Sequence, residues 1–161
     1  MAKKLKPKRV SDSQTVMSQL MMPQDANHYG YVHGGVILSI ADKVAYVCAS
    51  RHAEKMCTTA AVDSVSFKSP IKVGHLVTFF ASVNWVGHTS MEVGIKIISE
   101  DLLTGEKVHT NSCYFTVVAI DQKGRPSLVP PLLLESGIEK ERNQQAQERR
   151  AFRLAQRNKK R

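Results

Sequence analysis

The stretch 23–52 constrains the fold of this chain more than any other. Its first half is polar and rich in glycine, whereas its second half places apolar residues at three- and four-residue steps, the period of an α-helix. Further apolar residues occupy the remaining sides of this helix. A helix that is apolar nearly all round is normally enclosed by the rest of its domain. We therefore expect a central buried helix that opens near Gly35, ends near Arg51 and buries Ile37, Ile40, Ala41, Val44, Ala45 and Cys48.

Strand patterns account for most of the remaining chain. Apolar and polar residues alternate in 76–86 and again in 89–99, with Gly87 and His88 between them. Two residues between alternating runs favour a β-hairpin, and Gly at the first turn position suits a type II′ turn. Further strands are expected at 15–22, 58–67 and 107–120. One long helix with several antiparallel strands predicts an α+β fold, in which a curved antiparallel sheet wraps around the helix.

The 161 residues suit one domain with a single core. We expect a disordered basic N-terminus at 1–12, a folded domain at 13–134 and a basic, helical C-terminal tail at 135–161. That tail has helix-forming composition but a weak apolar stripe of Ile138, Ala146, Phe152 and Leu154.

The net charge of +9 belongs to the two ends of the chain. The first nine residues contribute +5 and residues 139–161 contribute +6, which leaves −2 for residues 10–138. A nucleic-acid-binding domain usually carries its positive patch on a folded face, so this distribution favours solvated tails over specific nucleic-acid binding.

Other features indicate a cytoplasmic protein that does not bind to a membrane. No apolar run is long enough to span a bilayer, and the basic start of the chain lacks the apolar stretch of a secretory signal. The three cysteines share no metal-ligand spacing, and their odd number fits a reducing compartment. We expect no metal and no cofactor.

One carboxylate interrupts the central helix, and two interpretations of it are open. In the structural one, Asp42 reaches solvent at the rim or pairs with Lys43 or Arg51. In the functional one, it faces a stripe of small residues and acts as an acid–base group. The loop before it ends in Gly34 and Gly35, and a helix N-terminus offers unpaired N–H groups that can polarise a carbonyl oxygen.

Several segments of the chain resemble the acyl-CoA thioesterases of the hotdog fold, and more narrowly their acyl-CoA hydrolase branch. The first is DANHYGYVHGGVILSIADKVA at 25–45, which is followed in the expected order by 59–74, 85–93, 101–106, 110–116 and 124–131. The resemblance covers about residues 15–132. It implies the hotdog fold, in which a long central helix is wrapped by a curved sheet.

The resemblance also implies a reaction, the hydrolysis of acyl-CoA to CoA and a carboxylic acid. In this family the paired Asn and acidic residue fall on Asn27 and Asp42. Asp42 is then the general base or the nucleophile, and Asn27 orients water or the thioester carbonyl. The backbone N–H groups of Gly34 and Gly35 are the candidate oxyanion donors. The family forms its site between two subunits, so a homodimer is expected to be required, and its higher assembly suggests a trimer of dimers.

Contacts to coenzyme A are implied at two places. One is Lys68 before a proline bend, and the other is the turn Gly87, His88, Thr89 and Ser90. The family commonly has Arg where this chain has His88, and a neutral His cannot grip a phosphate bidentately. Basic residues of the C-terminal tail are a possible substitute. The acyl chain needs an apolar slot, for which the candidate walls, or else plain core residues, are Leu38, Tyr46, Val65 and Phe67.

Other interpretations remain. His33 competes for the acid–base role because an unperturbed His titrates near neutral pH. His28 could border the thioester, and Asn111 is either a hydrogen-bonded strand residue or a ligand. At the level of the whole protein, the alternatives are a non-catalytic acyl-CoA-binding regulator whose basic tails contact nucleic acid, and a hotdog dehydratase. The dehydratase motif around a catalytic His is absent from the sequence.

Overall fold

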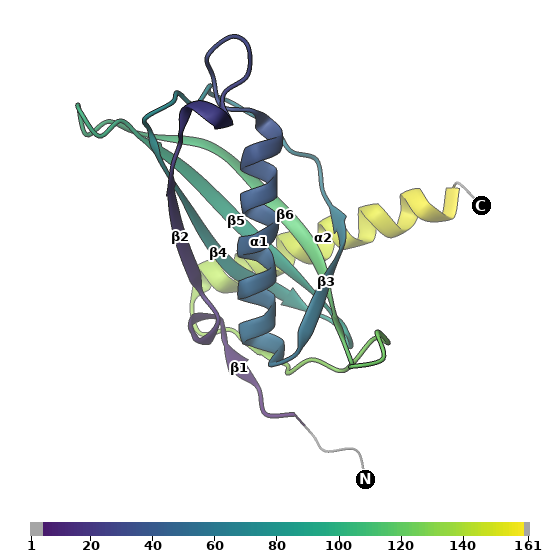
Figure 1. Cartoon of the computed structure of the whole chain (residues 1–161). Coiled ribbons are helices and arrows are strands. Elements are labelled where there is room, and N and C mark those ends of the chain that lie inside the picture. Colours follow the sequence, from purple (N-terminus) through teal and green to yellow (C-terminus); the bar gives the residue numbers. More distant parts are fainter. Residues whose placement is uncertain (1–4, 160–161) are drawn as a thin grey trace.

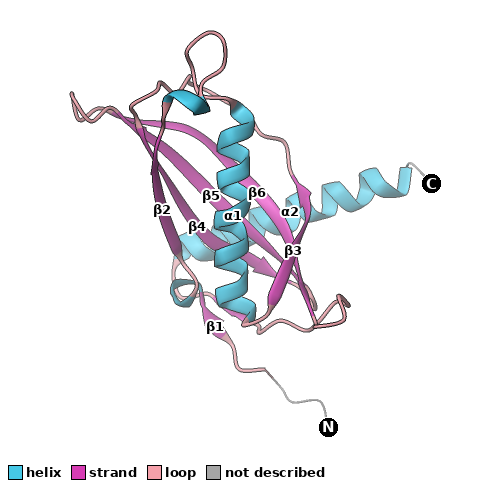
Figure 2. Ribbon diagram, viewed as in Figure 1, coloured by secondary structure: helices cyan, strands magenta, loops and turns pink. Residues whose placement is uncertain are grey.

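The computed structural model describes residues 5–159 and places a long helix in the curve of a five-stranded sheet (Figure 1). The strands follow the order β2-β4-β5-β6-β3, and every neighbouring pair is antiparallel. This arrangement confirms the predicted α+β fold (Figure 2). The main elements are β2 (Thr15–Leu20), α1 (Gly34–Ala53), β3 (Met56–Val62), β4 (Leu76–Val86), β5 (Ser90–Glu100), β6 (Lys107–Ile120) and α2 (Gly137–Lys159).

The core lies between α1 and the concave face of the sheet. All six helix residues expected inside are buried, and Ala41, Ala45 and Ala49 are fully inaccessible. These small side chains let the helix approach the sheet closely. Each large apolar side chain enclosed in this way contributes roughly 1.5–3 kcal/mol. The strands contribute alternate residues, as predicted: Val77, Phe79, Ala81 and Val83 from β4, and Met91, Val93, Ile95 and Ile97 from β5.

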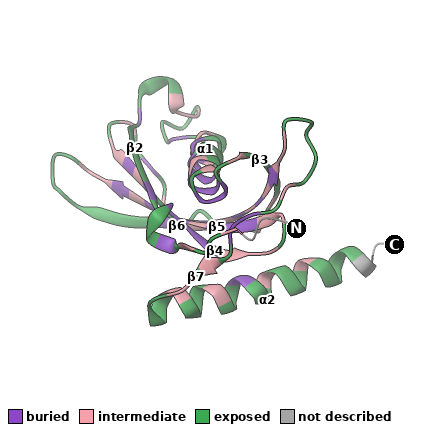
Figure 3. Ribbon diagram, turned by 90° about the horizontal axis from the view of Figure 1, so that it is seen from below, coloured by how far each residue is buried: buried purple, intermediate pink, exposed green. Residues whose placement is uncertain are grey.

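Helix α2 crosses the opposite, convex face of the sheet (Figure 3). Of the predicted apolar stripe, Ala146 is buried, while Ile138, Phe152 and Leu154 are exposed. The stripe therefore does not hold the helix. Polar side chains of the sheet are buried at this face instead, among them Asn84 and Glu92, which are 5% and 2% exposed.

The N-terminal segment differs from the expectation of disorder at 1–12. Lys8–Arg9 form a short strand, β1, that pairs in parallel with β7 (Leu132–Leu133), and a 3-10 turn, η1 (Val10–Asp12), follows it. Val10 is buried, and Lys8 forms an ion pair with Glu54 at 2.9 Å. Residues 1–4 of the predicted segment lie outside the described residues.

Strand boundaries and one turn also differ from the prediction. The strand expected at 58–67 ends at Val62, and an irregular segment leads from there to β4. The predicted type II′ turn, with Gly87 at its first central position, is wrong. Gly87 does not have a positive φ, and its N–H bonds the Ser90 carbonyl, so His88 and Thr89 form the tip. Glycine is needed at position 87 because a Cβ there would lie 2.6 Å from the Trp85 ring.

No helix in the described part of the chain is long and apolar enough to cross a bilayer.

Candidate active site

Asp42 lies on the exposed side of α1 and is oriented by a residue of the neighbouring strand. Its Oδ1 accepts a hydrogen bond from the Thr59 hydroxyl at 2.6 Å. Thr59 belongs to β3, the last strand of the sheet. A hydroxyl that donates to a carboxylate makes a short, charge-assisted bond. This bond fixes one oxygen of Asp42, and the other oxygen remains able to accept a proton.

A shallow hollow surrounds this carboxylate, between α1 and β3. It is lined by Asp42, Lys43, Tyr46, Val47, Cys57, Thr58 and Thr59. The structural interpretation, in which Asp42 reaches solvent or pairs with Lys43 or Arg51, is thus right about the exposure of Asp42 and wrong about these two partners. Arg51 donates instead to the Gln14 carbonyl and the Thr15 hydroxyl, and the ion pairs among residues 5–159 include none to Asp42.

Gly34 and Gly35 form the first turn of α1, where the sequence places oxyanion donors. His33 precedes them and does not cap the helix with its side chain. N–H groups in the first turn of a helix have no partner four residues earlier in the helix. A Cβ at Gly35 would meet nothing within 4 Å, so the space beside its Cα is open. At Gly34 a Cβ would lie 3.1 Å from the Phe67 ring, which packs directly against the helix start.

Asn27 stands in the loop that precedes the helix. Its Oδ1 accepts the N–H groups of Tyr29 and Tyr31, at 2.9 and 3.2 Å. Two backbone donors settle which side-chain atom is the oxygen. The side-chain N–H groups of Asn27 take part in none of the hydrogen bonds of the described residues. The loop geometry thus leaves Asn27 available as a donor.

The two predicted catalytic residues are far apart within one chain. Asp42 follows Gly34 by eight residues, which corresponds to about 12 Å along a helix. The loop that carries Asn27 projects beyond the N-terminal end of α1 rather than back along it (Figure 1). One chain therefore does not bring Asn27 and Asp42 together.

The predicted coenzyme A contacts are also separated. Lys68 is exposed, and its backbone N–H bonds Thr110 near the start of β6. Ser90 pairs with Val118 near the end of the same strand. Eight residues of strand separate these two positions, about 26 Å. Lys68 and the turn Gly87, His88, Thr89 and Ser90 therefore lie at opposite ends of the sheet.

The candidate acyl-slot residues do not form one cluster. Tyr46 lines the Asp42 hollow, and Phe67 covers the helix start. Both side chains are partly exposed, at 44% and 47%. Leu38 and Val65 are half-buried, and Val65 packs against the core.

None of the other candidate residues lines the Asp42 hollow. His33 and His28 are exposed, and the His28 ring lies 4.1 Å from the Tyr29 ring. Asn111 is buried on β6, where its Oδ1 accepts a hydrogen bond from the Thr110 hydroxyl at 3.1 Å.

The cysteines are unreactive by position. Burial raises the pKa of Cys48 to about 12 and that of Cys113 to about 12, and it also raises the pKa of Cys57. Nucleophilic chemistry needs the thiolate, which these environments disfavour. Across residues 5–159 no three His, Cys, Asp or Glu side chains are grouped closely enough to hold a metal ion.

Comparison with known proteins identifies the family. Residues 29–106 match the Thioesterase superfamily. The chain is 49% identical over 138 residues to protein VdlD of Helicobacter pylori, covering 86% of this chain and 79% of that protein. It is 37% identical over 125 residues to YkhA of Bacillus subtilis, an uncharacterized acyl-CoA thioester hydrolase, covering 78% of this chain and 73% of that protein. The chain belongs to the hotdog-fold acyl-CoA thioesterases.

Solved structures of this family share the whole architecture. The acyl-CoA hydrolase of Staphylococcus aureus, determined with butyryl-CoA and CoA, superposes with a TM-score of 0.88 at 33% identity and covers 95% of this chain and 93% of its own. A hexameric acyl-CoA thioesterase superposes with a TM-score of 0.91 at 36% identity and covers 94% and 97%.

Three mutants of the Staphylococcus aureus enzyme bear on the site. Each has one residue replaced by Ala: an Asn, an Asp or a Thr. The three mutated positions are 15 and 17 residues apart, which are the separations of Asn27, Asp42 and Thr59 in this chain. No sequence pattern singles out Thr59, because the register that places it opposite Asp42 depends on how β3 packs against α1.

Proposed function

We propose that this chain hydrolyses acyl-CoA thioesters to CoA and a carboxylic acid. The observation that carries the proposal is the Thr59–Asp42 hydrogen bond of 2.6 Å beside an open hollow. This hydrogen bond orients the Asp42 carboxylate, and the chain belongs to a family of thioester hydrolases. The matching spacing of Asn, Asp and Thr in the Staphylococcus aureus mutants supports the same three residues here.

Asp42 acts as the general base in this proposal. Its free oxygen accepts a proton from water while the water oxygen forms a bond to the thioester carbonyl carbon. The resulting oxyanion is bound by donors, and the carbon–sulfur bond then breaks to release the CoA thiolate, which takes up a proton. The N–H of Gly35 is one donor. Asn27 is the other, because its oxygen is already occupied by the loop backbone and its side-chain N–H groups are available.

The role of Asp42 as a nucleophile is the alternative, and isotope labelling distinguishes the two. A single turnover in ¹⁸O-labelled water with enzyme in excess places the label in the product acid if water attacks directly. A covalent anhydride on Asp42 that water opens at the Asp42 carboxyl carbon instead puts an unlabelled carboxylate oxygen into the first product and leaves the label on Asp42, where mass spectrometry of the protein detects it.

We further propose that the complete site forms between two subunits. One chain separates Asn27 from Asp42, and β3, which carries Thr59, is an edge strand with one side unpaired in the sheet of residues 5–159. Edge strands offer backbone groups for pairing with another chain. A dimer through this edge, and a trimer of such dimers as in the hexameric relative, fits the family.

Complementation tests the shared site. Asn27→Ala and Asp42→Ala proteins are each expected to be inactive. Co-refolding them produces mixed dimers in which one site has both residues intact, so about half of the per-dimer activity should return. Verified mixed dimers without activity contradict the shared site.

Coenzyme A contacts in the dimer follow from the same separation. Lys68 and the turn at Gly87 to Ser90 lie about 26 Å apart in one chain, so we propose that they contact one ligand from different subunits. His88 replaces the usual Arg of this turn and offers a weaker phosphate contact when neutral. A His88→Arg variant, which restores the residue usual at this turn, is expected to bind CoA more tightly than the wild type.

A non-catalytic regulator with nucleic-acid-binding tails has less support. Arg149 and Arg153 of the basic C-terminal segment form ion pairs with Glu92 and Asp63 on the sheet, which removes two charges from solution contacts. We propose a cytoplasmic location on the basis of the three buried, unpaired cysteine thiols.

Thiol release from acyl-CoAs of short to long chain length tests the activity. Wild-type protein is expected to release CoA, and Asp42→Asn, which keeps an acceptor for Thr59, should lose about 100-fold or more in kcat. Glu106→Gln, an exposed loop acid, is the matched control. Unchanged release in an intact Asp42→Asn dimer contradicts the assignment and makes His33 the next candidate. Binding of acyl-CoA without any release favours the regulator.

A further inference from the structure

Helix α2 is attached to the sheet by a buried polar network rather than by apolar packing. Arg149 donates to both carboxylate oxygens of Glu92, at 3.1 and 2.7 Å, and its guanidinium lies 3.6 Å from the centre of the Tyr114 ring. Asn143 donates to the Asn84 carbonyl at 2.8 Å. Since Glu92 is 2% exposed, its charge needs this partner, and the helix is held in one register.

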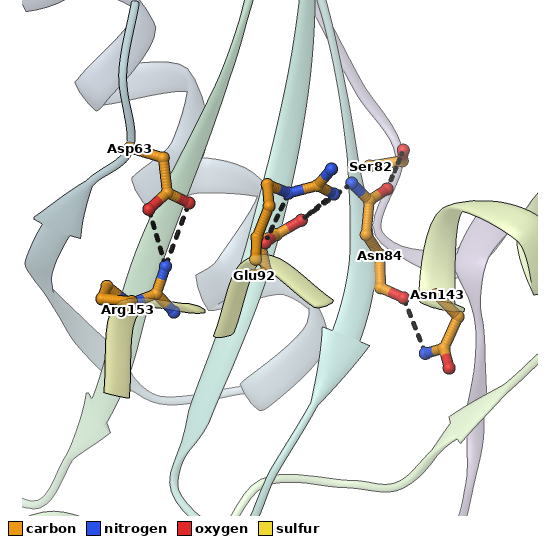
Figure 4. A network of polar contacts seen from close by, with 7 residues as sticks. Asp63, Ser82, Asn84, Glu92, Asn143 and Arg153 are labelled. Atoms are coloured by element: carbon orange, nitrogen blue, oxygen red, sulfur yellow. Dashed lines mark hydrogen bonds and ion pairs between the residues drawn. The ribbon is translucent and has the colours of Figure 1, made fainter. Parts of the chain in front are cut away.

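One turn further along α2, Arg153 reaches beyond the central strands. Residues four apart on a helix share a face, so the fixing of Arg149 also places Arg153. A single Arg153 nitrogen, Nη1, donates to both oxygens of Asp63, at 2.8 and 3.0 Å (Figure 4). Both side chains are largely shielded, with 28% and 19% exposed. Shielding makes this pair stronger than an ordinary surface ion pair.

Asp63 is the first residue after β3, so the ion pair holds the beginning of the irregular segment 63–74. The Asp63 N–H also bonds the Tyr114 carbonyl at 3.0 Å, which fastens the same residue to β6. Between Thr59 and Ala61 the pairing of β3 with β6 shifts register. The hydrogen bonds between β3 and β6 alone hold a strand with such an irregularity less firmly. A fixed residue just beyond the irregularity, here Asp63, keeps the end of β3 in place.

The segment held in this way touches two parts of the candidate site. Thr59, which orients Asp42, lies four residues before Asp63, and Phe67, whose ring packs against Gly34, lies four residues after it. Lys68 follows at once. The Arg153–Asp63 ion pair thus acts as a clamp on the convex face of the sheet. It fixes the position of a segment that borders the candidate site on the concave side.

We propose that Arg153 is a positioning residue, which acts through Asp63 to hold the segment 63–74 in the place that acyl-CoA binding requires. The proposal rests on the proposed function. Release of the clamp lets Phe67 and Lys68 move away from the helix start, so substrate binding weakens more than the chemical step. Misplacement of a substrate-positioning group by about 1 Å is enough to change binding or rate by 10-fold or more.

Hydrogen exchange of the full-length dimer tests the clamp without depending on catalysis. Arg153→Met keeps the apolar stem and removes the charge, and it should raise amide exchange in 63–70 about 10-fold. Arg157→Met, one turn later, is the control, because Arg157 has no ion pair within the described residues. Asp63→Asn should reproduce the effect of Arg153→Met, and the exchanged pair Asp63→Arg with Arg153→Asp should restore protection. Unchanged exchange in Arg153→Met overturns the proposal.

Kinetics then separates positioning from a purely structural contact. For Arg153→Met we expect KM for acyl-CoA to rise about 10-fold while kcat changes less than about 3-fold, and Arg157→Met should match the wild type. Faster exchange with an unaltered KM overturns the positioning role. If wild-type protein releases no thiol from any acyl-CoA, the proposed function fails, and titration of non-hydrolysed acyl-CoA replaces KM as the binding readout for the same variants.

Discussion

Replacement of Thr59 by Val isolates the hydroxyl that orients Asp42. Valine has the same shape as threonine and the same preference for strands, so the substitution removes a donor and little else. Thr59 is exposed, and loss of its hydroxyl leaves no buried group without a partner. The free energy of unfolding should therefore change by less than about 0.5 kcal/mol.

The size of the catalytic effect follows from the 2.6 Å hydrogen bond to the carboxylate. Hydrogen bonds to charged groups contribute about 1.5–3 kcal/mol, and the exposure of both partners places this one at the lower end. About 1.4 kcal/mol of lost orientation corresponds to a 10-fold lower rate. We expect this loss in kcat, with KM nearly unchanged, because the hydroxyl contacts the base rather than the substrate in the proposed arrangement.

Initial rates of thiol release for wild type, Thr59→Val and Thr59→Ser measure the effect. Serine keeps the oxygen and should recover most of the rate lost in the valine variant. Two results would refute the reasoning. An unchanged kcat in Thr59→Val shows that orientation by the hydroxyl contributes nothing, and equal losses in both variants show that keeping the hydroxyl does not preserve the rate.

Three further predictions concern the fold. Burial lowers the pKa of His52 below 6.5, and its bond to the Pro130 carbonyl at 3.0 Å partly offsets this effect. The contribution of neutral His52 to the free energy of unfolding should therefore be complete above pH 6.5 and fall on acidification, by roughly 1.4 kcal/mol per pH unit at most. Thermal melts of His52→Gln should show a flatter pH dependence than those of the wild type. Arg149→Met leaves the Glu92 charge buried and alone and should cost about 3 kcal/mol in urea unfolding at fixed protein concentration, whereas the double variant with Glu92→Leu should recover most of this loss. Iodoacetamide at pH 7.5 should leave Cys48 and Cys113 unmodified in the native protein and label both in urea, as read by mass spectrometry; native labelling contradicts their raised pKa values.

The central helix and the alternating strands could be predicted because each follows a short period. The burial of Ile37, Val44 and Cys48 is set by the helical repeat, and that of Phe79 and Ile95 by the strand repeat. The docking of α2 could not be predicted from an apolar stripe, because its contacts are long-range charges. Glu92 and Arg149 are 57 residues apart, and neither has a local pattern that marks it as buried.

For the site, the sequence places Asp42 and the glycine donors on the same helix, and the structure agrees with both positions. It does not indicate that Thr59 orients Asp42, since β3 contains two adjacent threonines and its register against α1 is a tertiary property. The resemblance places Asn27 and Asp42 in one site, yet the length of helix between them keeps them apart in a single chain.

The exposure of Asp42 itself argues for a site completed by a second chain. A carboxylate open to water acts in a high-dielectric surrounding, where its charge and its donors are screened and a bound thioester is not protected. Efficient proton transfer needs the hollow between α1 and β3 to be covered. β3 is an edge strand in the sheet of residues 5–159, and in the dimer proposed above a second chain that pairs at this edge covers the hollow. In the same proposed dimer, we expect this pairing to bring the Asn27 loop of the partner to the carboxylate. We therefore expect one association step to close the sheet edge, shield Asp42 and supply Asn27, so activity and dimer formation should rise together as protein concentration increases.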